Sequence, residues 1–454
     1  MRENRLLNGP VAPGLARLAL PIMAGMFLQT AFNLVDTWFV SQIGPEAIAA
    51  VSMNIPVFFI VLALGSAVAV GTSSLVAQSI GADDMERASG VAAQAWTLAL
   101  AVGVVTAIAG TALARPLLEL MGARGLALEY AVDYTRIILA GNPIFFLYAA
   151  LDGVLRGEGD MKTSTLVLAA ATVVNIILDP IFIFGWGPFP ALGVGGAALA
   201  TMIARGLGLI AIIAHFVWKR STIKINFLNW YWHSPTIFGI FQIGIPTSIS
   251  QAMISLTLFI YNYLGNQFGD HVVAALGLGF RIDSLAFMPG MAVSIATVTM
   301  VGQNFGAKLY PRALRVWRTA MVMVFASMGS IGLIIIIFAR HLVALFTEAP
   351  EVVEQTLLYL RIIPWFYGFL GMGICTSSAF QGIGRGFPAL LVNLLRLGFI
   401  GIPLAFLFVH LGWGPAGLWW AFAMSDMTFG LVGITWFSFV TSRLFKRLSE
   451  SSQG

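Results

Sequence analysis

Four aspartates, Asp36, Asp179, Asp283 and Asp426, lie deep inside long apolar stretches of a chain in which only 10% of residues are charged. The other acidic residues lie in loops or near the ends of those stretches. An ionised carboxylate is costly in hydrocarbon, so an acid at such a depth marks a proton or ion pathway. A buried carboxylate can hold a proton, and its oxygens can replace water around Na⁺. These residues therefore predict cation-binding chemistry inside a membrane.

Composition supports the membrane setting. The 454 residues are 58% hydrophobic, with a mean hydropathy of +0.88, whereas a soluble domain has about 25% charged residues. A surface this poor in charge excludes a soluble enzyme, a nucleic-acid binder and a disordered scaffold. The single cysteine, Cys375, excludes a disulfide framework and a cysteine-ligated metal centre. The fold expected is an all-α integral membrane protein.

Runs long enough to cross a bilayer, about 20 apolar residues each, predict twelve transmembrane helices. They lie at 14–41, 47–78, 88–115, 128–153, 162–185, 192–218, 235–265, 271–303, 312–340, 353–381, 387–411 and 416–443. Lys and Arg gather in the termini and the even-numbered loops, so both termini are expected in the cytoplasm of a multi-pass plasma (inner) membrane protein. Eleven or thirteen spans would place the basic C-terminus outside.

An internal repeat relates the two halves at a constant offset of 225. Residues 74–82 (SLVAQSIGA) match 299–307 (TMVGQNFGA), and Pro21 matches Pro246. Six spans per copy make both copies enter from the same side, which predicts a parallel pseudo-twofold repeat typical of transporters. We expect an N-lobe at 1–218, a cytoplasmic linker at 219–234 that includes an amphipathic segment at 226–233, and a C-lobe at 235–454.

Depth brings one set of polar residues together in the N-lobe. At about 1.5 Å per residue, Asp36, Asp179, Thr201 and Tyr134 reach a similar level in the outer half of their spans, and Asn175 lies one turn before Asp179. Two close carboxylates share a proton, or Asp36, Asn175, Asp179 and Thr201 together bind Na⁺. The alternative is a hydrogen-bonded polar cluster that only fixes helix packing. Asn33, one turn before Asp36, is a weaker candidate.

The repeat provides an internal comparison. Adding 225 to Asp36 and Asp179 gives Tyr261 and Leu404, so the C-lobe lacks both acids. Its span at 235–265 offers Gln251 as a polar candidate. Asp283 and Asp426 are interpreted either as a C-lobe proton or substrate site, or as ion pairs and polar packing, with Arg281 as one partner considered for Asp283.

A series of motifs along the first copy resembles the multidrug and toxic compound extrusion family, in its DinF-like branch. They are Leu20-Pro21, Asn33-Leu34-Val35-Asp36, VAQSIGA at 76–82, RGEGD at 156–160, NIILDP at 175–180 and GAALAT at 196–201. The resemblance implies two six-helix lobes in a V shape that export amphipathic, often cationic drugs in exchange for H⁺ or Na⁺. It also implies a hinge at Pro21, where proline removes a helix hydrogen bond.

Other functions remain open at this point. A lipid-linked precursor flippase of the same superfamily usually needs a cationic cavity for pyrophosphate, and few cations lie deep in the spans: Arg205, Arg281 and Arg396. A membrane channel or enzyme is a further alternative. No Walker A sequence is present, so no ATP is expected. We expect a non-enzymatic monomer with no cofactor beyond the coupling ion, whose partners are drug-like organic cations and the bilayer, not nucleic acid. The sequence does not choose between H⁺ and Na⁺ or name a substrate.

Overall fold

The computed structural model describes residues 5–218, 221–225 and 232–450, and every regular element in this part of the chain is a helix. Eleven helices or continuous helical runs among them are long and apolar enough to cross a membrane, and one bent pair makes a twelfth. The predicted all-α membrane fold is therefore confirmed. The prediction of twelve spans holds when the bent pair is counted as one.

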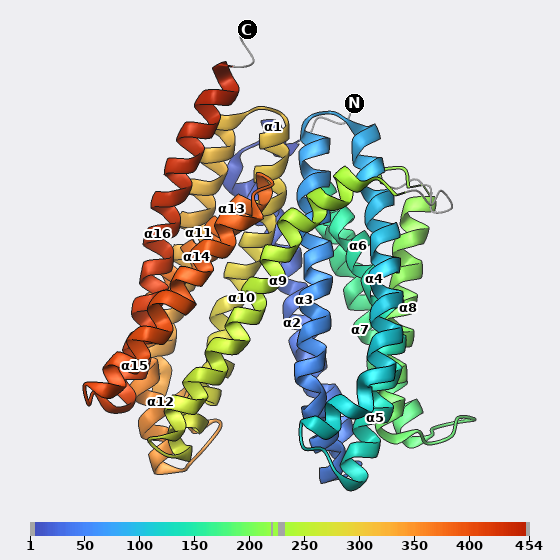
Figure 1. Cartoon of the computed structure of the whole chain (residues 1–454), viewed down its shortest axis with the longest axis vertical. Helices are drawn as coiled ribbons and strands as arrows, with labels where there is room; N and C mark the ends of the chain where they lie inside the picture. Colours follow the sequence, from blue (N-terminus) through green and yellow to red (C-terminus); the bar gives the residue numbers. More distant parts are fainter. Residues whose placement is uncertain (1–4, 219–220, 226–231, 451–454) are drawn as a thin grey trace. The chain divides into compact units, whose positions relative to one another are not determined.

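Two compact units make up the chain. The N-unit runs from Leu20 to Ile245, and the C-unit joins the chain up to Ala19 to residues from Pro246 onward. The N-unit contains α3 (Pro45–Gly81), α4 (Met85–Leu120), α5 (Gly125–Ala140), α6 (Asn142–Glu158), α7 (Met161–Phe184) and α8 (Gly193–Val217). These helices lie side by side, with α3 packed on α6 and α7 packed on α8 (Figure 1).

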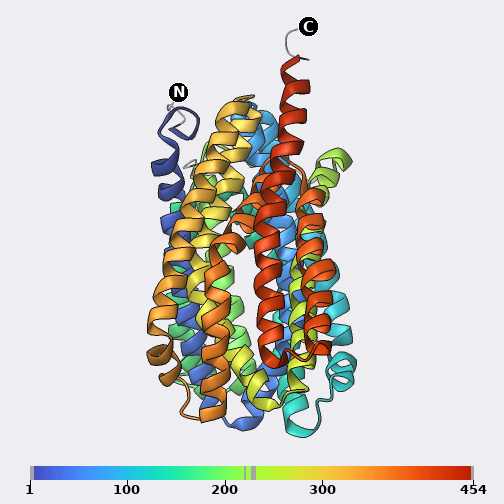
Figure 2. The same ribbon diagram turned by 90° about the vertical axis from the view of Figure 1, so that its left-hand side faces the viewer.

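The C-unit is built in the same way. Its elements are α1 (Arg5–Asn8), α10 (Asp270–Gly306), α11 (Tyr310–Ala344), α12 (Pro350–Ile362), η1 (Ile363–Phe366), α13 (Tyr367–Gly382), α14 (Gly386–Leu394), η2 (Leu395–Gly401), α15 (Ile402–His410) and α16 (Gly414–Glu450). Here η1 is a short 3₁₀ turn and η2 is a π-helical turn. The short helix α1 and the C-terminal end of α16 lie at the same end of this unit (Figure 2).

The fourth span of each copy is broken at a corresponding place. In the N-unit α5 and α6 meet at Gly141 with a bend of 48°, and a Cβ at Gly141 would lie 2.1 Å from the sulfur of Met202. In the C-unit the 3₁₀ turn Ile363–Phe366 interrupts the span between α12 and α13. Phe366 is the repeat position of Gly141, so both copies keep the irregularity.

The first helix of each copy belongs to both units. The units divide α2 (Val11–Ser41) between Ala19 and Leu20, and α9 (Ser234–Asn266) between Ile245 and Pro246. Both divisions fall beside the matched prolines Pro21 and Pro246, which lie inside continuous helices.

Specific contacts explain this division. In the C-unit, the Arg312 side chain donates to the carbonyl of Gly9. In the N-unit, α9 lies so close to α3 that a Cβ at Gly71 would be 2.4 Å from the carbonyl oxygen of Ile240. A Cβ at Gly244 would be 2.3 Å from that of Ala67. The compact units thus differ from lobes cut at 218 and 235, and those lobe boundaries remain predictions.

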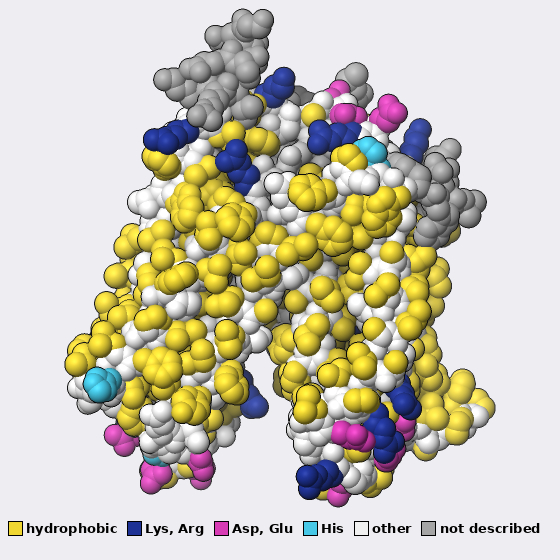
Figure 3. All heavy atoms as spheres, viewed as in Figure 1, with side chains coloured by type: hydrophobic (Ala, Val, Ile, Leu, Met, Phe, Trp, Pro, Cys, Tyr) yellow, Lys and Arg dark blue, Asp and Glu magenta, His cyan; other side chains and the backbone are white. Residues whose placement is uncertain are grey.

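The surface of each unit matches a membrane setting. Hydrophobic side chains cover the middle of the visible face of each unit, and most of the visible Lys, Arg, Asp and Glu side chains lie at its two ends (Figure 3). Phe27, Phe259 and Leu34, for example, are 63%, 69% and 70% exposed. Large exposed apolar surfaces of this kind mark contact with lipid in a protein with many spans.

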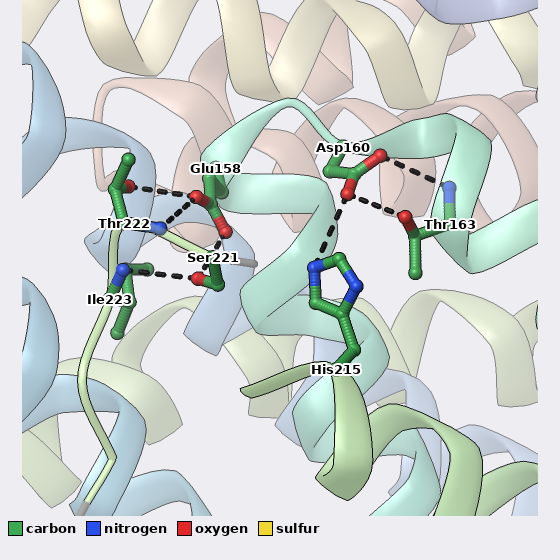
Figure 4. A network of polar contacts seen from close by, with 7 residues as sticks. All are labelled: Glu158, Asp160, Thr163, His215, Ser221, Thr222 and Ile223. Atoms are coloured by element: carbon green, nitrogen blue, oxygen red, sulfur yellow. Dashed lines mark hydrogen bonds and ion pairs between the residues drawn. The ribbon is translucent and has the colours of Figure 1, made fainter. Parts of the chain in front are cut away.

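Part of the predicted linker is fastened to the N-unit. Glu158, at the end of α6, accepts hydrogen bonds from the Ser221 hydroxyl and from both the backbone N–H and the hydroxyl of Thr222, each 2.7 Å long (Figure 4). Ile223 is 1% exposed in the apolar core of the same unit. Residues 219–220 and 226–231, and with them most of the predicted amphipathic segment, lie outside the described residues.

Beside this contact, Asp160 caps the start of α7. Its carboxylate accepts hydrogen bonds from the Thr163 backbone N–H (3.0 Å) and the Thr163 hydroxyl (2.6 Å), and it lies 3.6 Å from Nε2 of His215 (Figure 4). A side-chain oxygen at this position satisfies a backbone donor that the helix itself leaves free. The cap fixes the α6–α7 turn that carries Glu158.

Replacing Glu158 by Ala removes the acceptor of three hydrogen bonds, and each bond to a charged group stabilises by about 1.5–3 kcal/mol. We expect residues 221–225 to detach and trypsin to cleave after Lys224 several-fold faster, measured by mass spectrometry of limited digests. Glu86→Ala removes an exposed acid that starts α4 and serves as the control. Equal cleavage rates in the two variants would show that Glu158 does not hold this segment.

Candidate cation site in the N-unit

Asp179 is the most deeply buried acid of the predicted cluster. It lies on α7 with 0% exposure, one turn after Asn175, which is 4% exposed. The Asn175 Nδ2 donates to Asp179 Oδ1 at 2.9 Å, as the i,i+4 spacing on one helix face allows. The other carboxylate oxygen, Oδ2, is buried and has no hydrogen-bond partner among the described residues.

Asp36 is the second acid. It is partly buried on α2, and its Oδ1 is also buried without a hydrogen-bond partner in the described part of the chain. It lies close enough to Asp179 for the two carboxyl groups to interact electrostatically. Asn33 lies apart from this pair, because its side chain is exposed and accepts a hydrogen bond from Gln29 at 3.1 Å.

Tyr134 lies on α5 and Thr201 on α8, and both were predicted to lie at the level of the two acids. Tyr134 packs against an apolar cluster formed by Val40, Ala47, Ile183, Val194 and Ala197. Val40 is one turn after Asp36, Ile183 is one turn after Asp179, and Ala197 is one turn before Thr201. The helix turns next to Asp36, Asp179 and Thr201 therefore pack together around Tyr134. Tyr134 also interacts electrostatically with both Asp36 and Asp179.

This arrangement has a clear chemical capacity. The Thr201 hydroxyl donates its proton to the Ala197 carbonyl at 3.0 Å, which leaves its oxygen free to accept. Two carboxylate oxygens without partners, an amide and a hydroxyl therefore belong to one polar region. A buried polar atom without a partner costs about 1–3 kcal/mol, and a bound proton or a cation with oxygen ligands would remove that penalty. The residues present fit either ion.

The C-unit neutralises its aspartates with protein groups. Asp283 is 0% exposed and accepts hydrogen bonds from the hydroxyls of Tyr359, at 2.5 Å, and Tyr367. Arg281, which was considered as its partner, is exposed, and no ion pair joins the two among the described residues. Of the two alternatives for Asp283, partners on a neighbouring span are therefore present, because neighbours two positions apart on a helix point to different faces.

Asp426 is held by an arginine. Its Oδ1 lies 2.8 Å from Nε and 2.6 Å from the terminal nitrogen of Arg396. Arg396 belongs to the π-helical turn η2, and Tyr261, the repeat position of Asp36, donates to the carbonyl of Gly401 in the same turn at 3.2 Å. π-Helical turns release backbone carbonyls from the regular ladder. Gln251 is exposed on α9 and stands apart from this network.

Two features of the N-unit were not placed by sequence reasoning. Asn54 on α3 donates to the carbonyls of Ala50 (3.0 Å) and Ala131 (3.3 Å) and accepts from Thr135, which ties α3 to α5. Arg205 on α8 lies one turn after Thr201, and its guanidinium lies over a phenylalanine ring. The i,i+4 spacing from Thr201 was the available signal for Arg205, which had been noted only as one of a few deep cations.

The Arg396–Asp426 pair makes a direct stability prediction. Arg396→Met leaves a fully buried carboxylate without its partner, which typically destabilises by about 3–5 kcal/mol. We expect a clearly lower Tm in detergent for Arg396→Met, and recovery of most of the loss in Arg396→Met/Asp426→Leu, measured by thermal unfolding. A single variant as stable as the double variant would contradict the pairing.

Comparisons with known proteins extend the description to the whole chain. Residues 21–181 and 246–407 each match the MatE family model. The first residues of the two matches, Pro21 and Pro246, are 225 positions apart, which is the offset of the internal repeat. The two matched segments together cover most of the chain.

Similar proteins agree with this match. The chain is 29% identical over 434 residues to an FAD transporter of Shewanella oneidensis, with coverage of 94% of this chain and 95% of the relative. It is 29% identical to a probable multidrug resistance protein NorM of Thermotoga maritima, covering 89% and 87%. Two crystal structures, described as MATE in the straight and in the bent conformation, are each 32% identical to this chain, with a TM-score of 0.92. Each comparison covers 98% of this chain. It covers 99% of the chain in the straight structure and 98% of the chain in the bent structure. The chain is thus a multi-pass member of the MatE family of multidrug and toxic compound extrusion transporters.

Proposed function

We propose that this protein exports amphipathic organic compounds across the plasma membrane in exchange for H⁺ or Na⁺, and that the coupling ion binds at Asp36 and Asp179. The observation that carries the proposal is the pair of buried carboxylate oxygens, Asp36 Oδ1 and Asp179 Oδ2, that have no hydrogen-bond partner among the described residues and, unlike the equally unpartnered oxygen of Asp426, belong to acids without an arginine partner there. The transport class rests on the family match and on the multidrug relative.

Each residue of the site has a defined task. The Asn175 amide holds one oxygen of Asp179, so the incoming proton or Na⁺ meets the other oxygen. Asp36 supplies the second carboxylate from α2. Because two nearby carboxylates resist being ionised together, the first ion to bind neutralises the pair. For Na⁺, the Thr201 oxygen and the Asn175 amide complete an oxygen ligand set, and Tyr134 closes the cluster against apolar side chains.

Coupling requires the ion and the substrate to favour different conformations. Asp36 lies on α2, the helix that is divided between the two units beside Pro21. Similar proteins have been solved in straight and bent conformations. We propose that Pro21 is a hinge, and that ion binding at Asp36 shifts the bending of α2. We also propose that the protein works as a monomer with both termini in the cytoplasm.

The range of substrates extends beyond cationic drugs. The FAD transporter among the relatives carries a cargo with a flat aromatic ring system and negatively charged phosphates. A second candidate function is therefore export of aromatic anions. Such a substrate is negatively charged, as is the pyrophosphate-bearing cargo of the lipid-linked flippase alternative. Both candidates use the same coupling site, and no enzymatic step is involved.

Coupling is tested in proteoliposomes that export ethidium, driven separately by a pH step and by a Na⁺ step. Asp36→Asn and Asp179→Asn remove the carboxylates that bind the ion, so we expect each to lose at least about nine-tenths of gradient-driven efflux, a change of the size given by about 1.4 kcal/mol. Glu46→Gln, at an exposed acid on α3, should transport normally. The gradient that drives the wild type identifies the ion. Wild-type rates in both aspartate variants under either gradient would disprove the site.

Pro246, the repeat position of Pro21, provides a matched control for the proposed hinge. Pro21→Ala restores a helix hydrogen bond next to the coupling helix segment, whereas Pro246→Ala makes the same change in α9, which carries no coupling acid. We expect the first substitution to slow ethidium efflux several-fold more than the second, measured at equal protein density. Equal effects would mean that Pro21 is only a passive kink.

A further inference from the structure

Arg205 is a cation placed near the middle of a membrane span. It lies twelve positions after Gly193, the first residue of α8, which corresponds to about 18 Å along the helix at about 1.5 Å per residue. Thr201 lies one turn before it on the same helix face. The residue as a whole is partly exposed.

Two aromatic rings surround the guanidinium group. Its Cζ atom lies 5.0 Å from the ring centre of Phe145 on α6 and 5.7 Å from that of Phe58 on α3. Contacts of this kind attract a cation to the ring face, and they turn the side chain toward the interior of the N-unit. Arg205 also interacts electrostatically with Tyr134 and Tyr148, which places it beside the candidate cation site.

Arg396 of the C-unit provides the comparison. Its Cζ atom lies 5.0 Å from the ring of Phe429 and 5.9 Å from that of Phe422, which are almost the same surroundings. Arg396, however, is paired with Asp426 at 2.6 Å. No carboxylate lies within ion-pair distance of Arg205 among the residues that the structure describes. Two arginines of one chain thus share an aromatic setting, and only one of them has a counter-ion.

We infer that Arg205 binds the carboxylate or phosphate group of an aromatic substrate, which takes the place that Asp426 occupies beside Arg396. A guanidinium group deep in a membrane without a counter-ion is unfavourable. Its planar fork of N–H donors matches both acid groups through two parallel hydrogen bonds. Phe58, which is partly exposed, provides an apolar surface for the aromatic part. The inference rests on the proposed export function and specifies its substrate class as acidic aromatic compounds.

The test compares two flavins that differ only in one phosphate. Flavin mononucleotide and riboflavin are titrated onto the purified full-length protein in lipid nanodiscs, and binding is followed by quenching of flavin fluorescence. The wild type should bind flavin mononucleotide at least about a hundredfold more tightly than riboflavin, as expected for two hydrogen bonds to a charged group.

Variants assign that preference to Arg205. Arg205→Met keeps the length of the side chain but removes the charge, so both flavins should bind with the affinity that riboflavin has for the wild type. Arg205→Lys keeps the charge without the fork and should show an intermediate preference; it also serves if the Met variant does not fold. Arg136→Met, at an exposed arginine of α5, should behave like the wild type.

Two results would overturn the inference: a wild type that binds flavin mononucleotide no better than riboflavin, or an Arg205→Met variant that keeps the preference. Ethidium efflux measured with the same preparation separates this failure from failure of the export function. If efflux depends on Asp36 but the phosphate preference is missing, only the role of Arg205 is lost. If no gradient drives efflux in the wild type, the proposed export function itself fails.

Discussion

Every deep ionisable group in this protein must be neutralised, because hydrocarbon offers no water to solvate a charge. The two units meet this requirement differently. The C-unit surrounds Asp283 with two tyrosine hydroxyls and pairs one oxygen of Asp426 with Arg396, although the other oxygen of Asp426 is buried without a hydrogen-bond partner among the described residues. The N-unit leaves one oxygen of Asp36, one oxygen of Asp179 and the charge of Arg205 without such partners among the described residues. The proposed binding of an ion and a substrate would supply the partners that these groups of the N-unit lack.

The two copies of the repeat share one architecture but differ in the charged residues that they carry. The two copies share their span plan, their broken fourth span and their first-helix proline. They differ at the positions that carry charge, where Asp36 corresponds to Tyr261 and Asp179 to Leu404. Tyr261 still makes a polar contact, to the carbonyl of Gly401, but it brings no charge. The fold therefore does not require the acids, which supports the view that they serve transport.

Much of the fold was predictable from the sequence, because hydropathy determines the spans and the repeat determines their grouping. The grouping of Asp36, Asp179, Asn175, Thr201 and Tyr134 was predicted from depth alone and stays a prediction, although the Asn175–Asp179 hydrogen bond agrees with the one-turn spacing. The partners of Asp283 and Arg205 could not be predicted in this way, since they depend on how each helix is rotated about its axis toward its neighbours. Tyr359 and Tyr367 come from a span that is distant in sequence from Asp283, and the aromatic neighbours of Arg205 come from two other helices.

The division of α2 and α9 between the units bears on biosynthesis. Once the chain has been made as far as Ile245, all residues of the N-unit are present, including the start of α9 that packs on α3. The C-unit instead combines the first residues to be made with the last ones. The segment before Leu20 therefore waits during synthesis of more than two hundred residues before α10 and α11 exist to receive it. The boundaries of the compact units therefore do not coincide with those of the sequence repeat, and the C-unit has all its residues only after the final helices have been made.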